Sequence, residues 1–353
     1  MKLLYITNGI TGIGGLERVL SVKASYFADN MNYDICIVSL NEEGKESFYE
    51  FSPKISFRTI KVGRNKLKYL SGIRRIVNEF APDVISVCDD GIKGFVVPLC
   101  ILGKAKIVYE RHISKEMFTG GLPPNLKQRI FFMLMDMSCQ FYHKFVVLTN
   151  DNKLQWKSRN VEVIPNPLSF YPDSVSSLNK KRIIAVGKIS VQKGYDRLLE
   201  VWKLIRHKYP DWTIDIYGAG YFPVNGEFSG DSKNVSIQIN KPVKNIKDEY
   251  LSSSIYVLPS RFEGFGMVLV EAMACGIPCV AFDCPCGPRD IIRDGEDGFL
   301  VENGNIEQFT ERLSLLIENE KIRKKMGEKA RHNVQRYNVD VIARQWDRLF
   351  KSL

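Results

Sequence analysis

Long apolar runs are missing from this chain of 353 residues. No stretch approaches the roughly 18 consecutive apolar residues that a membrane-spanning helix needs. The apolar start after Met1 is too short for the core of a secretion signal. We therefore expect a cytoplasmic protein, with peripheral contact to the cytoplasmic face of a membrane as the remaining membrane role.

The cysteines lack the paired C-x2-C spacing of a zinc site. Eight are present, and four of them cluster: Cys275, Cys279, Cys284 and Cys286. Two of these flank a predicted helix-to-strand turn, where small thiol side chains commonly pack in a core. We expect reduced, buried thiols and no metal.

A dinucleotide fingerprint is also lacking, although a glycine-rich turn follows the first apolar strand at residues 2–7. Counted from Gly12, the last position of G-x-G-x-x-G is Glu17, and a carboxylate there would repel a pyrophosphate. Gly14 and Gly15 still allow a ligand near a helix that begins at about Leu16. A mere tight connection explains the turn equally well.

Basic residues outnumber acidic ones by 50 to 40, which gives a net charge of +10 and a pI near 9.1. This balance indicates an anionic partner, either a phosphorylated substrate or an acidic lipid surface, while no nucleic-acid motif is present. Eight basic residues and no acidic one lie between Phe51 and Asn78: Lys54, Arg58, Lys61, Arg64, Lys66, Lys68, Arg74 and Arg75. These basic residues could form a face that binds lipid or a diphosphate, and a solvated helix face explains them equally well.

Short apolar strands alternate with helical patterns along the whole chain, which predicts an α/β protein with mostly parallel sheets. The expected strands are 2–7, 33–40, 55–62, 83–87, 105–109, 144–148, 182–186, 212–217, 235–239, 255–258 and 278–282. The length suits two domains. We predict a first domain over 1–168, a serine- and proline-rich linker over 169–180 and a second domain over 181–336. The apolar stretch 128–137 is expected to be a core helix, with membrane contact as the alternative.

The stretch from Lys181 to Phe282 holds the strongest candidate site. Lys188 and Lys193 lie in the turn after one strand, and a second strand is followed by Gly264, Phe265 and Gly266 at a helix start. Free backbone N–H groups at a helix start suit phosphate oxygens, and two lysines add full charges. A diphosphate could be held there without a metal.

Two carboxylates in the same stretch suit neutral hydroxyl groups. Glu263 precedes the helix and can reach a group beyond the phosphates, while Glu271 lies further along it and can bind a vicinal diol such as a ribose. Gly218, after the strand 212–217, would permit close approach of a nucleotide, although a plain turn also needs it.

These residues resemble glycosyltransferase family 4, the retaining enzymes with the GT-B fold whose mark is a Glu-x7-Glu motif, here Glu263 to Glu271. The resemblance covers nearly the whole chain. It implies two facing Rossmann-like domains with an active site between them, and a last helix, 337–353, that returns to the first domain. Lys188 and Lys193 match the family's phosphate clamp, in which the first residue is usually arginine.

The family also has a histidine that contacts the donor sugar, and it matches His112. From its position alone, a solvated loop histidine would be the simpler reading. The resemblance implies that Gly14 and Gly15 face the donor. Glu110 and Arg111 are weaker candidates for acceptor contacts.

The predicted function is transfer of a hexose or N-acetylhexosamine from a nucleotide-diphosphate sugar, preferably a UDP-sugar, to a hydroxyl of a growing lipid-linked surface glycan. No Asp-x-Asp triplet occurs, which disfavours a metal-bridged diphosphate and predicts no metal cofactor. A nucleotide-sugar epimerase of the same fold, a dinucleotide-dependent oxidoreductase and a non-catalytic binding protein for an anionic membrane or nucleic acid are the alternatives.

Overall fold

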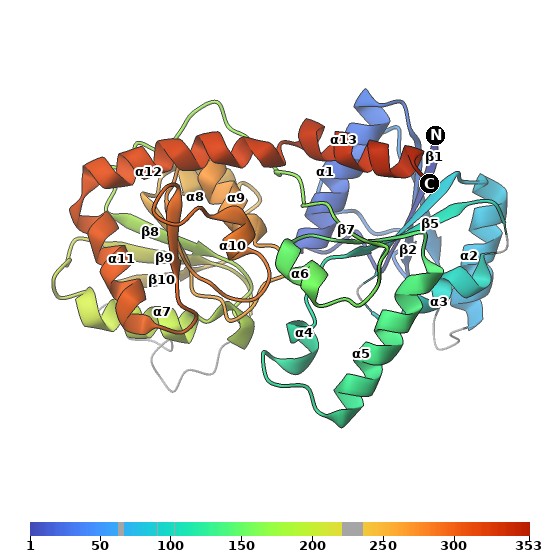
Figure 1. Ribbon diagram of the computed structural model, residues 1–353. Coiled ribbons are helices and arrows are strands. Elements are labelled where there is room, and N and C mark those ends of the chain that lie inside the picture. The colour runs from blue at the N-terminus through green and yellow to red at the C-terminus, as the bar shows by residue number, and fades with distance from the viewer. Residues whose placement is uncertain (63–66, 90, 102, 221–235) are drawn as a thin grey trace. The chain divides into compact units, whose positions relative to one another are not determined.

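The computed structural model describes residues 1–62, 67–89, 91–101, 103–220 and 236–353, and the chain divides into two compact units (Figure 1). One unit comprises Met1–Ser169 and Tyr337–Leu353, and the other comprises Phe170–Arg336. The segment 221–233, whose structure could not be predicted from its residue pattern, lies outside the described residues. No helix within the described ranges is long and apolar enough to cross a membrane.

In the first unit the described strands form one parallel sheet in the order β3-β2-β1-β4-β5-β6-β7. The strands are β1 Lys2–Thr7, β2 Asp34–Leu40, β3 Ser56–Ile60, β4 Val84–Cys88, β5 Lys106–Arg111, β6 Lys144–Val147 and β7 Val161–Val163. The helices are α1 Gly15–Asn30, α2 Leu67–Phe80, α3 Ile92–Val96, α4 Glu116–Thr119, α5 Leu126–Ser138, α6 Asn150–Leu154 and α13 Val339–Lys351, with 3-10 turns η1 Val97–Cys100 and η2 Cys139–Phe141.

The two faces of this sheet differ in chemistry, because side chains alternate along each strand. Leu4, Ile85 and Tyr109 point into a predominantly apolar core. The opposite face buries Tyr5, Ser86 and Glu110 instead. Buried polar groups need partners, so this second face is where a specific polar network can form.

Helix α13 at the C-terminus belongs to the first unit and packs beside α1 (Figure 1). Its residues Ile342, Trp346 and Phe350 are buried. Tyr33 Oη donates a hydrogen bond of 2.6 Å to Asp347 Oδ1, and the Leu168 amide donates to the Tyr337 carbonyl.

In the second unit the described strands again form one parallel sheet, in the order β10-β9-β8-β11-β12-β13. The strands are β8 Arg182–Val186, β9 Thr213–Tyr217, β10 Ile237–Asn240, β11 Ile255–Leu258, β12 Cys279–Phe282 and β13 Gly298–Val301. The helices are α7 Tyr195–Ile205, α8 Ile246–Leu251, α9 Met267–Ala274, α10 Pro288–Ile291, α11 Ile306–Glu318 and α12 Glu320–Asn333, with 3-10 turns η3 Val191–Lys193 and η5 Val334–Tyr337.

Both sheets have the strand order of a doubly wound Rossmann-like fold. In such a sheet the first three strands are added towards one edge and the following strands towards the other, so the order reverses between the first and fourth strands. The predicted fold class is therefore confirmed. The sequence missed β7, whose three residues give too few alternating positions to distinguish it from a loop, and β13, whose four residues begin with a glycine.

Two local predictions differ from the structure. Residues from Phe170 onward, expected in a linker, belong to the second unit, where the Ser176 amide donates to the Cys275 carbonyl and Ser176 Oγ donates to the Ser253 carbonyl. The stretch 128–137 forms α5 as expected, yet it is not a core helix, because Ile130, Met133 and Met137 are each about half exposed.

Candidate functional site

The candidate site of the second unit lies where ligands bind in doubly wound sheets, at the carboxyl ends of the two strands between which the strand order reverses. These strands are β8 and β11, which pair in parallel. Gly194, after β8, has φ +64°, and a Cβ there would collide with the Pro259 carbonyl after β11. The two loops are thus held in backbone contact by a glycine.

Lys193 and Glu263, which the sequence singled out separately, meet in this contact region. Lys193 Nζ donates to Glu263 Oε1 over 2.7 Å, and Ser260 Oγ donates to the same oxygen over 2.6 Å. The side chains of Lys193 and Glu263 are only 15% and 6% exposed. Lys188 is exposed. One lysine is therefore fixed by a carboxylate, and the other extends into solvent.

The loop between Glu263 and α9 is shaped by glycines. Gly266 has φ +99° and precedes the first residue of α9. The Glu263 amide donates to the Pro285 carbonyl over 3.0 Å. Gly287, with φ +131°, packs so tightly on Phe265 that a Cβ would overlap the Phe265 carbonyl. The loops after β11 and β12 therefore brace each other and fix where α9 begins, with Gly264 half-buried between them.

Glu271, the second carboxylate of the Glu-x7-Glu pair, lies inside α9 and is 1% exposed. Tyr250 Oη donates to its Oε2 over 3.3 Å. Burial and the nearby Glu271 carboxylate raise the pKa of the Cys275 thiol to about 12. The four clustered cysteines are all buried, and they are reduced.

Gly218 has a structural reason that needs no ligand. A Cβ at this position would overlap the carbonyl oxygen of Gly187, at the end of the neighbouring strand β8. Gly220 is in the same situation against Ile189. Close approach between β8 and β9 therefore accounts for both glycines.

The glycine turn of the first unit is partly filled by its own chain. The Glu17 carboxylate lies against the backbone of Gly12 and Gly14, where a Cβ at either position would overlap it. Gly15, the first residue of α1, has open space around its Cα. An acidic group therefore lies at this turn, as expected from Glu17 at the last position of the G-x-G-x-x-G spacing.

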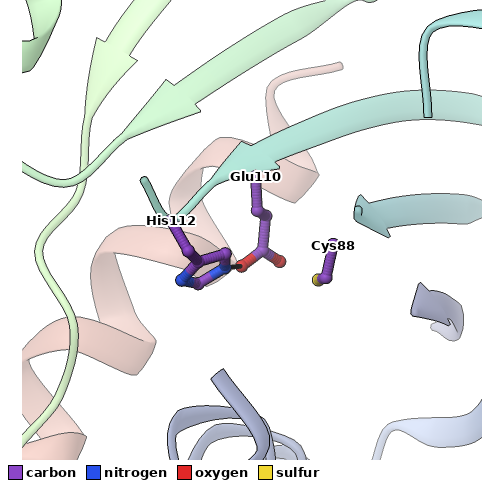
Figure 2. Close-up of side chains that lie close together, drawn as sticks. All are labelled: Cys88, Glu110 and His112. Carbon is purple, nitrogen blue, oxygen red and sulfur yellow. Dashed lines mark ion pairs between the residues drawn. The ribbon is translucent and has the colours of Figure 1, made fainter. Parts of the chain in front are cut away.

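Glu110 lies near the end of β5, and His112 directly follows this strand, with its side chain beside that of Glu110. Figure 2 shows the Glu110 carboxylate between the His112 imidazole and the Cys88 thiol. His112 Nε2 lies 3.4 Å from Glu110 Oε2, and the two side chains are 6% and 1% exposed. Histidine at the carboxyl end of a strand is well placed to contact a ligand.

Glu110 has strong internal partners. Lys23 Nζ, from α1, donates to its Oε2, and Ser86 Oγ donates to its Oε1 over 2.5 Å. Burial alone would raise the pKa of Glu110, but the Lys23 ammonium and the hydrogen bond from His112 outweigh it and hold the pKa at about 2. The carboxylate is therefore charged and committed to neighbours inside this unit.

Cys88, Glu110 and His112 are the described residues whose ligand atoms come close enough together to suggest a metal site, all within 4.8 Å. The Lys23 ammonium group already forms an ion pair with the Glu110 carboxylate and would repel a metal cation. The donor set therefore fits a lysine better than a metal ion.

Arg111 points away from Glu110, to the apolar side of the sheet. It is fully buried, its Nε donates to the Ile113 carbonyl over 3.1 Å, and its guanidinium lies over the rings of Phe118 and Trp156. This packing gives Arg111 a structural function, which the sequence did not indicate.

Sequence reasoning missed Lys23, Ser260 and Trp346. A signal for Lys23 was present, because Val19, Lys23 and Phe27 follow at intervals of four and share one buried helix face. A lysine at such a position needs a buried anion, and Glu110 supplies it.

Comparisons with known proteins agree with this geometry. Residues 171–333 match the family model "Glycosyl transferases group 1". An uncharacterized glycosyltransferase of Haemophilus influenzae is 31% identical, with 98% of each chain covered. The amylovoran biosynthesis glycosyltransferase AmsD of Erwinia amylovora is 32% identical over the same shares.

Solved structures show the same fold at low identity. Staphylococcus aureus TarM, crystallised as a mutant with Fondaparinux, alpha-GlcNAc-glycerol and UDP, has a TM-score of 0.81 at 16% identity, with 99% of each chain covered. Anabaena HepE in complex with UDP-glucose has a TM-score of 0.78 at 17% identity over the whole of both chains. Since a full-length relative exceeds 30% identity, the chain belongs to the group 1 glycosyltransferases, with the GT-B fold.

Proposed function

We propose that the protein is a retaining, metal-independent glycosyltransferase of family 4. It moves a hexose or N-acetylhexosamine from a UDP-sugar to a hydroxyl of a growing, lipid-linked surface glycan. The observation that carries the proposal is the buried contact of Lys193 with Glu263 and Ser260, at the reversal point of the second sheet.

The charges of this contact fit a donor with a diphosphate and a sugar. A cation near the diphosphate stabilises the charge that grows on the leaving phosphate as the sugar–phosphate bond breaks. Lys193 supplies this charge from a fixed position, Lys188 adds a second charge from the solvent side, and the loop 264–266 adds backbone N–H groups at the start of α9. Two lysines and N–H groups supply the charge that a metal ion supplies in other transferases, hence the proposed metal independence.

The carboxylates then bind the neutral parts of the donor. Glu263 would accept hydrogen bonds from sugar hydroxyls, and Glu271 from the ribose, while His112 would contact another edge of the sugar. In the retaining reaction of family 4, which the resemblance implies, the acceptor hydroxyl attacks from the face that the leaving diphosphate occupies. The acceptor proton passes to that diphosphate, and the products are the glycoside and UDP.

Relatives support the choice of donor and acceptor. TarM and HepE were crystallised with UDP or UDP-glucose. A Campylobacter jejuni relative, 22% identical, is named for adding N-acetylgalactosamine to a glycan on undecaprenyl diphosphate. Lipopolysaccharide 1,6-galactosyltransferase of Escherichia coli is 25% identical over 91% of this chain. Surface glycans are thus the acceptor class that we propose.

The donor can be tested by measuring the melting temperature of the purified protein with UDP, GDP, ADP, NAD and a set of nucleotide sugars. A ligand at 100 times its dissociation constant adds about 2.7 kcal/mol of stability. We expect stabilisation by UDP and UDP-sugars in the presence of EDTA. Stabilisation by NAD alone, or by no nucleotide, would contradict the proposal. Conversion of a UDP-sugar to its epimer without an acceptor would favour the epimerase.

We also propose that α5 rests on an anionic membrane surface, where a lipid-linked acceptor would lie. Its exposed apolar side chains recur at helical spacing and form one stripe: Leu126, Ile130, Met133, Leu134 and Met137. Phe141, in the turn η2 that follows α5, is exposed as well. Lys127 and Arg129 are exposed on the same helix. An apolar stripe with basic neighbours is typical of helices that lie in a lipid interface. A symmetric dimer through α5 would instead bring these like charges together.

Co-sedimentation with vesicles tests this surface. We expect binding to vesicles with anionic phospholipid and weak binding to phosphatidylcholine alone. Replacement of Leu126, Ile130 and Met137 by Gln should abolish binding without lowering the melting temperature. Leu204→Gln, at a half-exposed site in the second unit, is the control. A dimer that forms without lipid and is lost in the triple variant would refute the membrane assignment.

A further inference from the structure

A buried lysine connects the C-terminal helix to the histidine proposed to contact the donor. Lys23 is 2% exposed, its ammonium group contacts the Glu110 carboxylate, and it lies 4.1 Å from the centre of the Trp346 ring on α13. The Tyr5 ring is 5.3 Å away on another side. The ammonium group is thus confined by a carboxylate and two aromatic faces, an arrangement that stabilises a desolvated cation.

Glu110 links Lys23 to His112, because its carboxylate contacts both side chains. The same oxygen, Oε2, is shared by the Lys23 ammonium and by His112 Nε2. The other oxygen accepts from Ser86 Oγ, so the carboxylate cannot rotate without losing a hydrogen bond. A carboxylate that accepts from one ring nitrogen fixes both the orientation and the tautomer of a histidine.

We propose that Lys23 is a positioning residue for His112. Through Glu110 it holds the imidazole neutral, with its proton on Nε2, so that Nδ1 is an acceptor for a sugar hydroxyl. The arrangement itself is independent of the reaction, whereas the role of Nδ1 in donor binding rests on the proposed function.

The charge balance explains why a lysine is needed. Glu110 alone would be a buried anion, and the group beside it that can most readily take up a proton is the imidazole, which is ordinarily more basic than a carboxylate. Cys88 and Tyr5 also lie on this face, and neither a thiol nor a phenol can supply a positive charge. With Lys23 present, the carboxylate has its counter-charge and His112 needs no second proton.

The first test is the protonation of His112 in the free protein. The chain has four histidines, so imidazole nitrogen signals can be resolved by NMR and assigned with His112→Asn. In the parent at neutral pH we expect a neutral ring with the proton on Nε2. In Lys23→Met we expect both nitrogens to be protonated at the same pH, and Lys23→Arg should restore the parent pattern. Lys54→Met, which removes an exposed lysine of the same unit, should leave it unchanged.

The double variant Lys23→Met/Glu110→Gln keeps the test decisive if Lys23→Met does not fold, because it leaves no unpaired charge at this place in the interior. Without the ammonium group, the amide can turn either its oxygen or its NH₂ to the ring, so we expect a mixture of both neutral tautomers. A parent-like His112 spectrum in Lys23→Met, or in the double variant when that is the one that folds, would overturn the proposal.

The second test is kinetic and concerns the role of Nδ1. In Lys23→Met, kcat/KM for the donor should fall about tenfold at neutral pH, the factor that one hydrogen bond of ordinary strength contributes. The deficit should shrink as the pH rises and the extra proton leaves, which a merely structural defect would not do. A changed His112 spectrum with parent kinetics would leave the positioning function intact and refute the sugar contact.

Discussion

Glu110 shows how a charged side chain is maintained in the interior of the first unit. Each carboxylate oxygen has a hydrogen-bond donor, and one of them has a buried ammonium group. Removing a carboxylate from water costs several kcal/mol, and only such complete pairing compensates it. The consequence is a dependence of stability on pH that can be assigned to one residue.

The pKa of Glu110 is about 2 in the folded protein, against an ordinary 4.5. A lowered folded-state pKa stabilises the fold above the unfolded pKa, and this contribution is lost as the pH falls from about 4.5 to 2. The difference corresponds to about 3 kcal/mol. Glu110→Gln should therefore lower the melting temperature by about 10 °C at pH 7, and the gap to the parent should close towards pH 2.

The control is Glu162→Gln, which removes a carboxylate that is 43% exposed and paired with Lys144. Surface pairs of this kind contribute little, so its melting temperature should follow that of the parent at every pH. A gap for Glu110→Gln that stays constant from pH 7 to pH 3 would mean that the charge of Glu110 is not what stabilises the unit.

Lys193 and Glu271 should differ in the kinetic constant that they affect. Lys193→Ala removes a fixed charge that we propose to act on the leaving phosphate, so kcat should fall at least about 100-fold. Glu271→Ala removes a proposed ribose contact, so the donor KM should rise with a smaller change in kcat. Lys241→Ala, an exposed lysine of the same unit, controls for loss of charge. Parent activity in both site variants would show that the site is assigned wrongly.

Helix α7 depends on one glycine at its start. Gly194 has φ +64°, and a Cβ there would overlap the Pro259 carbonyl, whereas Gly120 has φ +65° and nothing within 4 Å. The backbone strain of alanine is the same at both sites, about 1 kcal/mol. Gly120→Ala should cost only this amount. Gly194→Ala should cost several kcal/mol more in urea unfolding and should also lower activity, because Lys193 is the adjacent residue. Equal losses of stability in the two variants would show that the backbone at Pro259 can move away from a Cβ without a cost in free energy.

Helices and strands could be predicted from the sequence where the pattern of apolar residues matches their burial in the fold. The strands 182–186 and 255–258 were predicted at their observed bounds, since both are continuous apolar runs flanked by polar residues or turns. Helix α5 was predicted as a helix but placed in the core, because a sequence does not show which side of an apolar helix lacks neighbours.

The candidate site was predictable in parts for the same reason. Lys193 and Glu263 could be named from their loops, but their contact depends on the pairing of β8 with β11 and on the glycine between the loops. Ser260 and Lys23 contribute through contacts over three residues and over 87 residues. The first is hidden among ordinary loop serines, and the second requires the tertiary fold.

At the scale of the whole molecule, the chain builds two units with separate cores. Trp202, Phe282 and Phe309 belong to the core of the second unit, and Tyr109 and Phe145 to that of the first. The second unit is one continuous segment, while the first is closed by residues from both ends of the chain. Loss of the C-terminus should therefore act on the first unit alone.

A chain that ends at Arg336 tests this division. It lacks α13, whose buried side chains are Ile342, Ala343, Trp346, Leu349 and Phe350. Four of these are large, and each stabilises by about 1.5–3 kcal/mol when buried. Their sum is comparable to the entire stability of a domain, 5–15 kcal/mol. We expect the truncated protein to lose one melting transition and the amide protection of β1 and β5, while UDP still stabilises the remaining transition. Loss of both transitions would show that the second unit does not fold independently, and retention of both would show that α13 contributes little to the first.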